Sequence, residues 1–449
     1  MKYIPFAFLL LLLFSCNNSP ETSAGSEDIE TMSLIERLPA ANIYEVNIRQ
    51  YTPEGTFAAF EEHLPRLKKM GVDILWFMPI FPISEEKRKG PMGSYYSVST
   101  FRDVNPEFGT MEEFKMLVDK MHSMGFIVIL DWVPNHTGWD HNWIKEHPDW
   151  YRKDPVADTI IHPSGTDWYD VAGLNYDIPE LRAAMITDLL FWIEEIDIDG
   201  YRMDVCDNVP IDFWRETIGQ LNQSKELFML AEAAYPPHRN EGIFHTSYAW
   251  DMLHSMNKAS KGEATIQSIW EAFEIDRAKY EKGWHMCFTT NHDENSWNGT
   301  VFERYGDKNL SYAVLAFTLQ GMPLIYSGQE AGLDKALRFF EKDTIDWSDI
   351  KYEKFYSTLL QLKHDHPALF NGKHGGDAQK LDSSEDVIAY YREKAGDTVM
   401  VAINLGDAEG TWDPAGMLSG EMTEVFTGSK GKEASEAILA PGEYRIWTN

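Results

Sequence analysis

The chain has 449 residues, of which 43% are hydrophobic, and it contains 15 Trp, 20 Tyr and 24 Phe. This apolar content can bury a large core and excludes an intrinsically disordered protein. The 71 acidic residues outnumber the 40 Lys and Arg, which gives a net charge of −31. Because so negative a surface repels phosphate backbones, nucleic acid is excluded as a partner, whereas a neutral substrate is not.

The N-terminus has the features of a lipoprotein signal peptide over residues 1–16. Lys2 precedes the apolar run Phe6–Phe14, which is too short to span a bilayer. The sequence Leu13-Phe14-Ser15-Cys16 resembles the lipobox of bacterial lipoproteins, in which the cysteine is lipidated; ordinary secretory cleavage is the alternative. Residues 17–32 read as a linker. We therefore expect an exported protein, anchored to a membrane through Cys16 and facing the periplasm or the cell exterior.

Beyond the linker, short apolar runs alternate with helical patterns. Seven runs have the length of buried parallel strands: Ile43–Ile48, Ile74–Pro79, Ile127–Val133, Gly200–Val205, Phe228–Ala231, Met286–Thr289 and Leu324–Tyr326. An eighth strand is predicted at Ser247–Trp250. The helical patterns include Phe57–Met70 and Met111–Met124, each followed by a glycine that can cap it. These units predict a (β/α)₈ TIM barrel over residues 33–365.

Two other segments depart from this alternation. Residues 137–173 follow the third strand and are rich in Trp, His and Asp, which predicts a small inserted domain. After residue 365, four β-rich runs are separated by Gly, Asp and Pro: Val387–Tyr391, Thr398–Asn404, Glu421–Val425 and Glu443–Trp447. We expect residues 366–449 to form an antiparallel β-sandwich domain.

Acidic residues stand at the ends of four predicted strands, where a barrel of this type collects its catalytic groups. The third strand leads to Asp131 and the fourth to Asp204, while the fifth leads to Glu232 and the seventh to Asp293. A carboxylate at one strand end often only caps a helix. Four of them, in chain order on the strands of one barrel, indicate an active site.

Together these segments resemble the α-amylase family, glycoside hydrolase family 13. The resemblance extends over most of the chain beyond residue 40. It rests on Asp131–His136, Gly200–Asp204, Leu230–Glu232 and Thr290–Asp293, with further matches at Gly93–Val98, Asn105–Gly109 and Tyr326–Glu330. It implies the barrel, the inserted domain, the β tail and an enzyme that hydrolyses O-glycosidic bonds with retention.

The resemblance also implies a role for each matched residue. Retention needs two carboxyl groups about 5 Å apart; Asp204 matches the nucleophile and Glu232 the general acid/base. Asp293 matches the third carboxylate, which stabilises the transition state. Arg202 should keep Asp204 ionised through its opposite charge. The implied substrate-binding residues are Tyr96, His136, Arg202 and His292, with Tyr95 as a competitor for the role of Tyr96 and Asp131 as the residue that orders Arg202.

Calcium is the only cofactor that the resemblance implies, and no organic cofactor is expected. Asn135 and Asp177 match oxygen ligands that many members of the family use. The sequence departs from the family at Asp207-Asn208, where Lys-His is common, and a substrate-binding lysine is therefore missing. A second departure is Thr100-Phe101, where Asp-Tyr is common.

The expected activity is cleavage of α-1,4-glucosidic bonds in starch, maltodextrin or related α-glucans. The alternative is an α-glucosidase, or an enzyme of the neopullulanase or cyclomaltodextrinase type, acting on short oligosaccharides. An inactive surface glycan-binding protein would require the loss of Asp204, Glu232 or Asp293, and all three are present. A metal-dependent barrel hydrolase would require clustered histidines, which His136 and His292 lack. The sequence leaves the oligomeric state and the endo or exo mode of attack open.

Overall fold

The structure is a computed structural model that describes Met1 and residues 32–414, 416–418, 421–431 and 437–449. The predicted signal peptide, its Cys16 and nearly all of the linker lie outside the described residues. Among the residues that the structure describes, no helix is both long enough and apolar enough to cross a membrane.

Eight parallel strands close into a barrel in the order β1-β10-β9-β8-β7-β6-β3-β2. Their bounds are β1 Ile43–Val46, β2 Ile74–Phe77, β3 Ile127–Trp132, β6 Gly200–Met203, β7 Phe228–Ala231, β8 Thr246–Tyr248, β9 Trp284–Cys287 and β10 Met322–Tyr326. The strands are buried because side chains fill the barrel and helices cover its outside. The predicted TIM barrel is confirmed. The strand predicted at Ser247–Trp250 is β8. It begins at Thr246, one residue before the predicted start, and ends at Tyr248, before Trp250.

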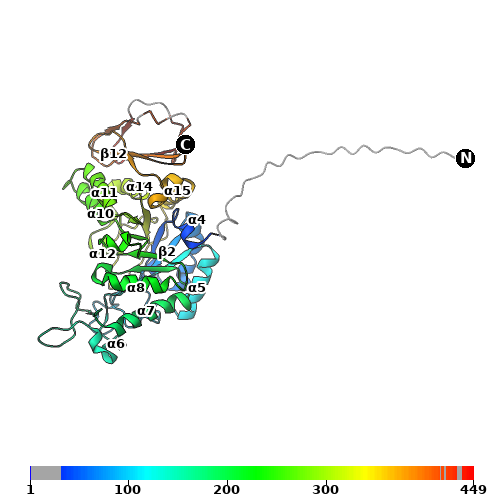
Figure 1. Cartoon of the computed structure of the whole chain (residues 1–449). Helices are drawn as coiled ribbons and strands as arrows, with labels where there is room; N and C mark the ends of the chain where they lie inside the picture. Colours follow the sequence, from blue (N-terminus) through cyan, green and yellow to red (C-terminus); the bar gives the residue numbers. More distant parts are fainter. Residues whose placement is uncertain (2–31, 415, 419–420, 432–436) are drawn as a thin grey trace. The chain divides into compact units, whose positions relative to one another are not determined.

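Helices of 4 to 16 residues follow most of the strands. They are α1 Leu34–Arg37, α2 Ile48–Tyr51, α3 Phe57–Glu61, α4 Leu64–Met70, α5 Met111–Ser123, α7 Pro179–Glu194, α8 Ile211–Leu221, α9 Pro237–Asn240, α10 Trp250–Ser260, α11 Gln267–Lys279, α12 His292–Trp297, α13 Val301–Tyr305, α14 Asn309–Thr318 and α15 Glu353–Asp365. Figure 1 shows β2 with helices such as α4, α5 and α8 around the barrel. The single helix predicted over Phe57–Met70 is wrong. It is divided into α3 and α4, because Pro65 in the first turn of α4 has no N–H to continue α3. Gly71 ends α4 in the left-handed conformation, as expected.

The segment after β3 is closed by a short antiparallel pair. Strand β4 (His136–Gly138) pairs with β5 (Val171–Gly173), so that His136 lies opposite Gly173. Helix α6 (Asn142–Glu146) and a 3₁₀ turn (Pro148–Trp150) lie between the two strands. This pair fixes His136 at the mouth of the barrel.

The C-terminal residues form antiparallel sheets, which confirms the predicted β domain. One sheet has the order β11-β12-β13-β17-β15, and β14 pairs with β16. The bounds are β11 Gln379–Lys380, β12 Val387–Lys394, β13 Asp397–Asn404, β14 Gly410–Trp412, β15 Thr423–Glu424, β16 Ala437–Leu439 and β17 Tyr444–Thr448. Side chains of the large sheet alternate between two cores. Ile388 and Val401 join the barrel core, whereas Val387 and Met400 pack with Trp412 in a second core.

Gly200, the first residue of β6, lies too close to the neighbouring strand β7 to carry a side chain. Its φ is +150°, and a Cβ placed on it would lie 1.8 Å from the Phe228 carbonyl oxygen. We expect Gly200→Ala to lower the free energy of unfolding by about 3 kcal/mol, since the backbone must move. Gly219 in α8 meets no atom within 4 Å, and Gly219→Ala should raise the free energy of unfolding by about 0.5–1 kcal/mol. Urea denaturation measures both values, and equal losses would contradict this account.

Candidate active site

A cavity of about 670 Å³ opens at the carboxyl ends of the barrel strands. Asp204 directly follows β6, Glu232 directly follows β7, and Asp293 lies in the first turn of α12. The cavity is lined by six of the residues predicted for the site: Tyr96, His136, Asp204, Glu232, His292 and Asp293. The structure thus brings into one cavity residues that are up to 197 positions apart in the sequence.

Arg202 lies fully buried beneath this cavity and binds three carboxylates. Its Nη1 is 2.8 Å from Asp131 Oδ1 and 2.8 Å from Asp204 Oδ1, and its Nη2 is 2.9 Å from Glu232 Oε2. The register of β3 and β6 places Asp131 opposite Arg202. Arg202 and Asp204 are two residues apart and therefore project from the same side of the chain. One guanidinium thus holds the two carboxyl groups predicted for nucleophile and acid/base close together.

Burial shifts the protonation of two of the carboxylates around Arg202, Asp131 and Asp204. It raises the pKa of Asp204 well above its ordinary value and that of Asp131 to about 6, while Arg202 opposes both shifts. The charge of Arg202 therefore favours the ionised form of Asp204 as expected, but burial outweighs it. Because Asp131 and Asp204 share one guanidinium, protonation of one of these two carboxyl groups affects the protonation of the other.

This coupling predicts a pH dependence. Protonation of Asp204 removes its charge, and its pKa is raised, so we expect kcat/KM to fall on the acid side at a higher pH than an ordinary aspartate would give. Asp131 raises the pKa of Asp204 by like-charge repulsion. Asp131→Asn should therefore lower the pKa of Asp204 and move the acid limb of the kcat/KM profile to lower pH, although kcat falls. An acid limb that stays in place or moves to higher pH would contradict this assignment.

Tyr96 and His292 form a hydrogen-bonded wall of the cavity. The Tyr96 hydroxyl lies 3.0 Å from Asp131 Oδ2 and 2.8 Å from His292 Nε2, and the two rings stack. Tyr95 points elsewhere, because its hydroxyl donates to Asn47 Oδ1 at 3.0 Å. Of the two tyrosines, Tyr96 is the one available to a ligand.

Glu45 is a residue of this site that sequence reasoning missed. It is fully buried in β1, and its Oε1 lies 2.5 Å from His292 Nδ1. Burial opposes protonation of His292, but the carboxylates of Asp293 and Glu45 outweigh burial and raise the pKa of His292 well above its ordinary value. The only sign of Glu45 in the sequence was an acidic residue inside an otherwise apolar strand.

The ion pair between Glu45 and His292 supports a prediction. Glu45→Gln removes an anion beside the imidazolium and should lower the pKa of His292. Loss of a hydrogen bond between charged groups costs about 1.5–3 kcal/mol, which corresponds to a loss of about 10–100-fold in kcat/KM. The basic limb of the kcat/KM profile should also move to lower pH. A purely structural role for Glu45 would lower the melting temperature and leave that limb unchanged.

His136 and Asp293, which are also predicted to bind the sugar, differ in charge. Burial lowers the pKa of His136 to about 4, so this imidazole is neutral near pH 7. Burial alone would raise the pKa of Asp293, but His292, 3.2 Å away, reverses this and lowers it below the ordinary value. The cavity therefore offers a neutral imidazole and a carboxylate to the hydroxyl groups of a ligand.

Val205 is held in a strained conformation between the two central carboxyl groups. Its φ is +42°, which is rare for a β-branched residue and costs about 1–3 kcal/mol. In this conformation its N–H donates to Glu232 Oε2 at 2.7 Å. The strain thus fixes the Glu232 carboxyl group beside Asp204.

Aromatic rings surround the mouth of the cavity. The segment after β3 contains four tryptophans, Trp139, Trp143, Trp150 and Trp168, and they do not share one environment. Trp143 and Trp150 are buried against each other, whereas Trp168 lines the cavity. Four further rings of the lining were not predicted: Tyr169 beside Trp168, Trp297 at the end of α12, and Phe339 and Phe340 in the loop after β10.

Calcium binding at Asn135 and Asp177 stays a prediction, and the residues fit it only in part. Asn135 Oδ1 is buried without a hydrogen-bond partner, as a ligand oxygen would be. Asp177, however, is exposed, and the guanidinium of Arg182 binds the adjacent Tyr176 carbonyl at 2.6 Å. Within the described ranges no three His, Cys, Asp or Glu side chains form a metal-binding group.

Comparisons with known proteins agree with this geometry. Residues 20–367 match the model of the alpha amylase catalytic domain. The chain is 28% identical over 416 residues to alpha-amylase MalA of Haloarcula japonica, covering 84% of this chain and 58% of that protein. It is 26% identical over 386 residues to a Bacillus cyclomaltodextrinase, covering 78% of this chain and 65% of that protein. The chain thus spans less than two thirds of the length of these two relatives.

Solved structures of similar length also match. The maltogenic alpha-amylase AmyB of Thermotoga neapolitana has a TM-score of 0.82 at 26% identity. The match covers 92% of this chain and 99% of the AmyB chain. An alpha-amylase of Lactobacillus plantarum has a TM-score of 0.81 at 29% identity with the same coverage. With a family model matching more than half of its length, the chain belongs to the alpha-amylase catalytic domain family.

Proposed function

We propose that this protein is a retaining glycoside hydrolase that cleaves α-1,4-glucosidic bonds of starch, maltodextrin or related α-glucans. The observation that carries the proposal is the binding of Asp204 and Glu232 by the two terminal nitrogens of Arg202, at the floor of a cavity lined by aromatic rings. Two carboxyl groups held this closely suit retention, which needs a separation of about 5 Å. The identity of the substrate rests on the family and on the named relatives.

In the first step, the Asp204 carboxylate attacks the anomeric carbon while Glu232 donates its proton to the leaving glycosidic oxygen. The C–O bond to the leaving sugar breaks, and a glycosyl ester of Asp204 forms. Asp293 and the imidazolium of His292 bind sugar hydroxyls and stabilise the oxocarbenium-like transition state.

In the second step, Glu232 acts as a base. It accepts a proton from water, which attacks the anomeric carbon and releases Asp204 as a carboxylate. A sugar hydroxyl in place of water gives transglycosylation. Arg202 is not consumed in either step, and its role is to hold the carboxyl groups in position and to balance their charge.

The time course of products on soluble starch and on maltotriose tests the substrate. A rapid fall in viscosity with release of several maltooligosaccharides is expected for the α-amylase activity. Glucose from maltotriose with starch left nearly intact would move the assignment to an α-glucosidase. No release from either substrate, by a protein with normal melting behaviour, would favour the glycan-binding alternative.

The cyclomaltodextrinase alternative is supported by the similarity to the Bacillus cyclomaltodextrinase, and the site departs from the common family pattern near Glu232. Asp207, which stands where a substrate-binding Lys is common, accepts the Ala234 N–H at 2.8 Å and lies 3.2 Å from His238. It is thus tied into the fold next to Glu232. Hydrolysis of β-cyclodextrin faster than starch would establish this alternative.

We also propose that the protein is an exported lipoprotein anchored through Cys16. The support is the sequence alone: a basic start, a short apolar run and a lipobox-like ending. Labelled fatty acid should be incorporated into the wild type and not into Cys16→Ser, which should leave the membrane fraction. Proteolysis of intact cells distinguishes the outer surface from the periplasm. Labelling of the variant would contradict the proposal.

A further inference from the structure

A second cavity, of about 620 Å³, lies at the opposite end of the barrel from the candidate active site. Its walls include Phe244–His245 and Gly283–His285, which lead into the amino ends of β8 and β9. The carboxylates of the active site, by contrast, follow the carboxyl ends of the strands. No step of the proposed reaction uses this second cavity.

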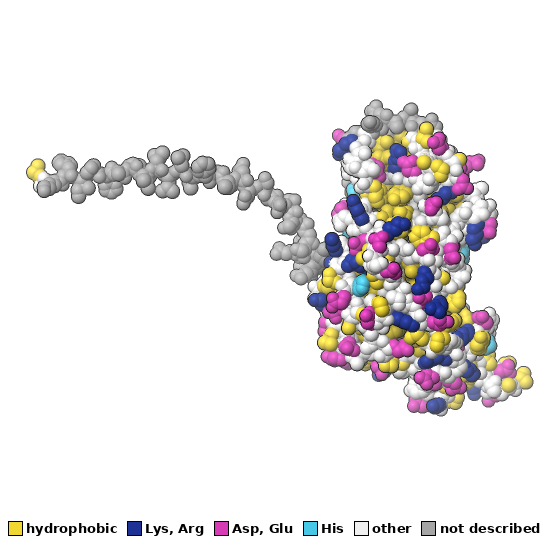
Figure 2. Space-filling model, turned by 180° about the vertical axis from the view of Figure 1, so that it is seen from behind, with side chains coloured by type: hydrophobic (Ala, Val, Ile, Leu, Met, Phe, Trp, Pro, Cys, Tyr) yellow, Lys and Arg dark blue, Asp and Glu magenta, His cyan; other side chains and the backbone are white. Residues whose placement is uncertain are grey.

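The cavity gathers positive charge in a protein whose net charge is −31. On the face in Figure 2, acidic and basic side chains are interspersed, with no large area of a single sign. Four cations line the cavity, Arg239, Arg277, Lys282 and Lys373, against two acids, Glu281 and Asp377. Arg277 is shared between Glu274 and Asp377. The other three cations form no ion pair with any described residue.

Arg239 is the most deeply buried of these cations, with 2% of its surface exposed. It donates to the Lys282 carbonyl and to Ser247 Oγ, and it lies 3.8 Å from the centre of the Tyr280 ring. Burial lowers its pKa to about 10, so it remains charged near neutral pH. Arg392, which is also buried without a carboxylate partner, instead donates five hydrogen bonds to backbone carbonyls.

The contrast between these two guanidinium groups points to a ligand. Arg392 is satisfied by the fold, whereas Arg239 keeps donors that an anion can use, and a buried charge gains most from such a partner. Two uncharged atoms of the lining, Trp284 Nε1 and Gln320 Oε1, are also buried without a hydrogen-bond partner among the described residues. The rings of Phe273 and Tyr280 supply apolar faces beside these polar groups.

We propose that this cavity binds a phosphorylated small molecule of sugar size, with its phosphate on Arg239 and the rim lysines Lys282 and Lys373. Several cations around one cavity suit a multiply charged anion, and the rings suit the face of a pyranose. The inference does not depend on the hydrolytic activity proposed above.

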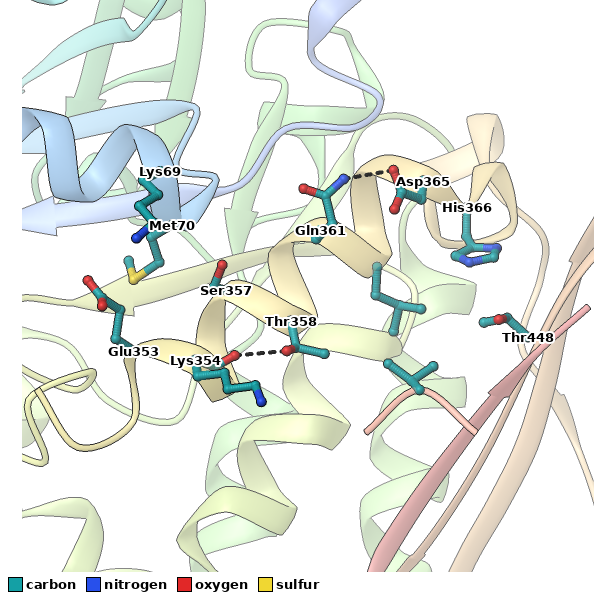
Figure 3. A pocket seen from close by; sticks show the side chains of 12 residues that line it. Lys69, Met70, Glu353, Lys354, Ser357, Thr358, Gln361, Asp365, His366 and Thr448 are labelled. Carbon is teal, nitrogen blue, oxygen red and sulfur yellow. Dashed lines mark hydrogen bonds between the residues drawn. The ribbon is translucent and has the colours of Figure 1, made fainter. Parts of the chain in front are cut away.

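A third cavity, of about 570 Å³, has a similar size but lacks this chemistry (Figure 3). It lies between α4, α15 and Thr448 at the end of β17. Its charges are balanced, with Lys69 and Lys354 against Glu353 and Asp365. Gln361 donates to Asp365 at 2.7 Å and Arg66 lies 3.7 Å from Glu353, so both acids of this cavity already have partners. Lys354 therefore provides a matched control.

Isothermal titration of the full-length protein with glucose 6-phosphate, inorganic phosphate and glucose tests the proposal. Glucose 6-phosphate should bind most tightly, and its affinity should fall with rising ionic strength. The double variant Lys282→Glu/Lys373→Glu should weaken it by about tenfold or more, and Lys354→Glu should change it less than twofold. Arg239→Gln should abolish it. Because Arg239→Gln can also impair folding, the exposed rim variants keep the test independent of stability.

Three results would overturn the proposal: no binding of glucose 6-phosphate by the wild type at millimolar concentration, equal affinity for glucose, or equal effects of the rim variants and Lys354→Glu. The last of these would place the bound molecule outside this cavity. Binding of glucose to the active site would leave the effect of the rim variants unexplained, so the two sites are distinguished by the same titrations.

Discussion

Asp204→Asn is expected to reduce kcat on starch by about 10⁴-fold or more, because the amide cannot form the glycosyl ester and the covalent route is lost. The side chain keeps its size, so Arg202 and Val205 stay in place around it. Initial rates of reducing-sugar release measure the loss. A variant that retains more than about a hundredth of wild-type kcat would contradict the assignment of Asp204 as the nucleophile.

The stability of the same variant provides its control. Burial raises the pKa of Asp204 in the folded state. A raised carboxyl pKa means that ionisation of Asp204 destabilises the fold as the pH rises through that value. Asp204→Asn removes this cost, so its melting temperature relative to wild type should be higher at about pH 8 than at about pH 5. Lost activity with an unchanged or raised melting temperature separates catalysis from folding.

Glu232→Gln is expected to reduce kcat on starch by about 10²–10⁴-fold, since proton transfer to the leaving oxygen is lost. Val205 N–H still has an oxygen to bind if the amide carbonyl takes the position of Oε2. The loss must depend on the leaving group. Fluoride leaves without protonation, so attack on α-maltosyl fluoride should retain most of its wild-type rate in a single turnover.

This dependence separates the two carboxyl groups. In Asp204→Asn both substrates should be inert, because neither can form the ester. In Glu232→Gln only the starch reaction requires the missing proton. On α-maltosyl fluoride, added azide should restore turnover, because it replaces water in the second step and needs no base. Equal losses on both substrates in Glu232→Gln would show that Glu232 is not the acid.

The strand ends were the part of the site that could be predicted. Asp204, Glu232 and Asp293 follow buried runs, and the closure of a parallel barrel places such positions around one opening. Glu45 could not be predicted as their partner, because it lies in β1 and His292 lies 247 residues later. Phe339 and Phe340 come from a loop after β10 whose path no local pattern fixes.

The electrostatics were predicted only in part, and the reason is physical. Counting charges along the sequence gives the attraction between Arg202 and Asp204 but not the burial of both groups. Burial contributes the larger shift and determines the direction in which the pKa of Asp204 moves. In the same way, the apolar pattern over residues 57–70 indicated helix correctly, while the break before α4 came from the missing N–H of Pro65.

The configuration of the first sugar released tests the central claim most directly. Proton NMR of maltotetraose or starch hydrolysis, recorded before mutarotation, resolves the α and β anomers of the new reducing end. Attack by Asp204 followed by attack of water inverts the anomeric carbon twice, so the account predicts that the α anomer appears first. Initial release of the β anomer would show a single displacement by water and would contradict the covalent role of Asp204.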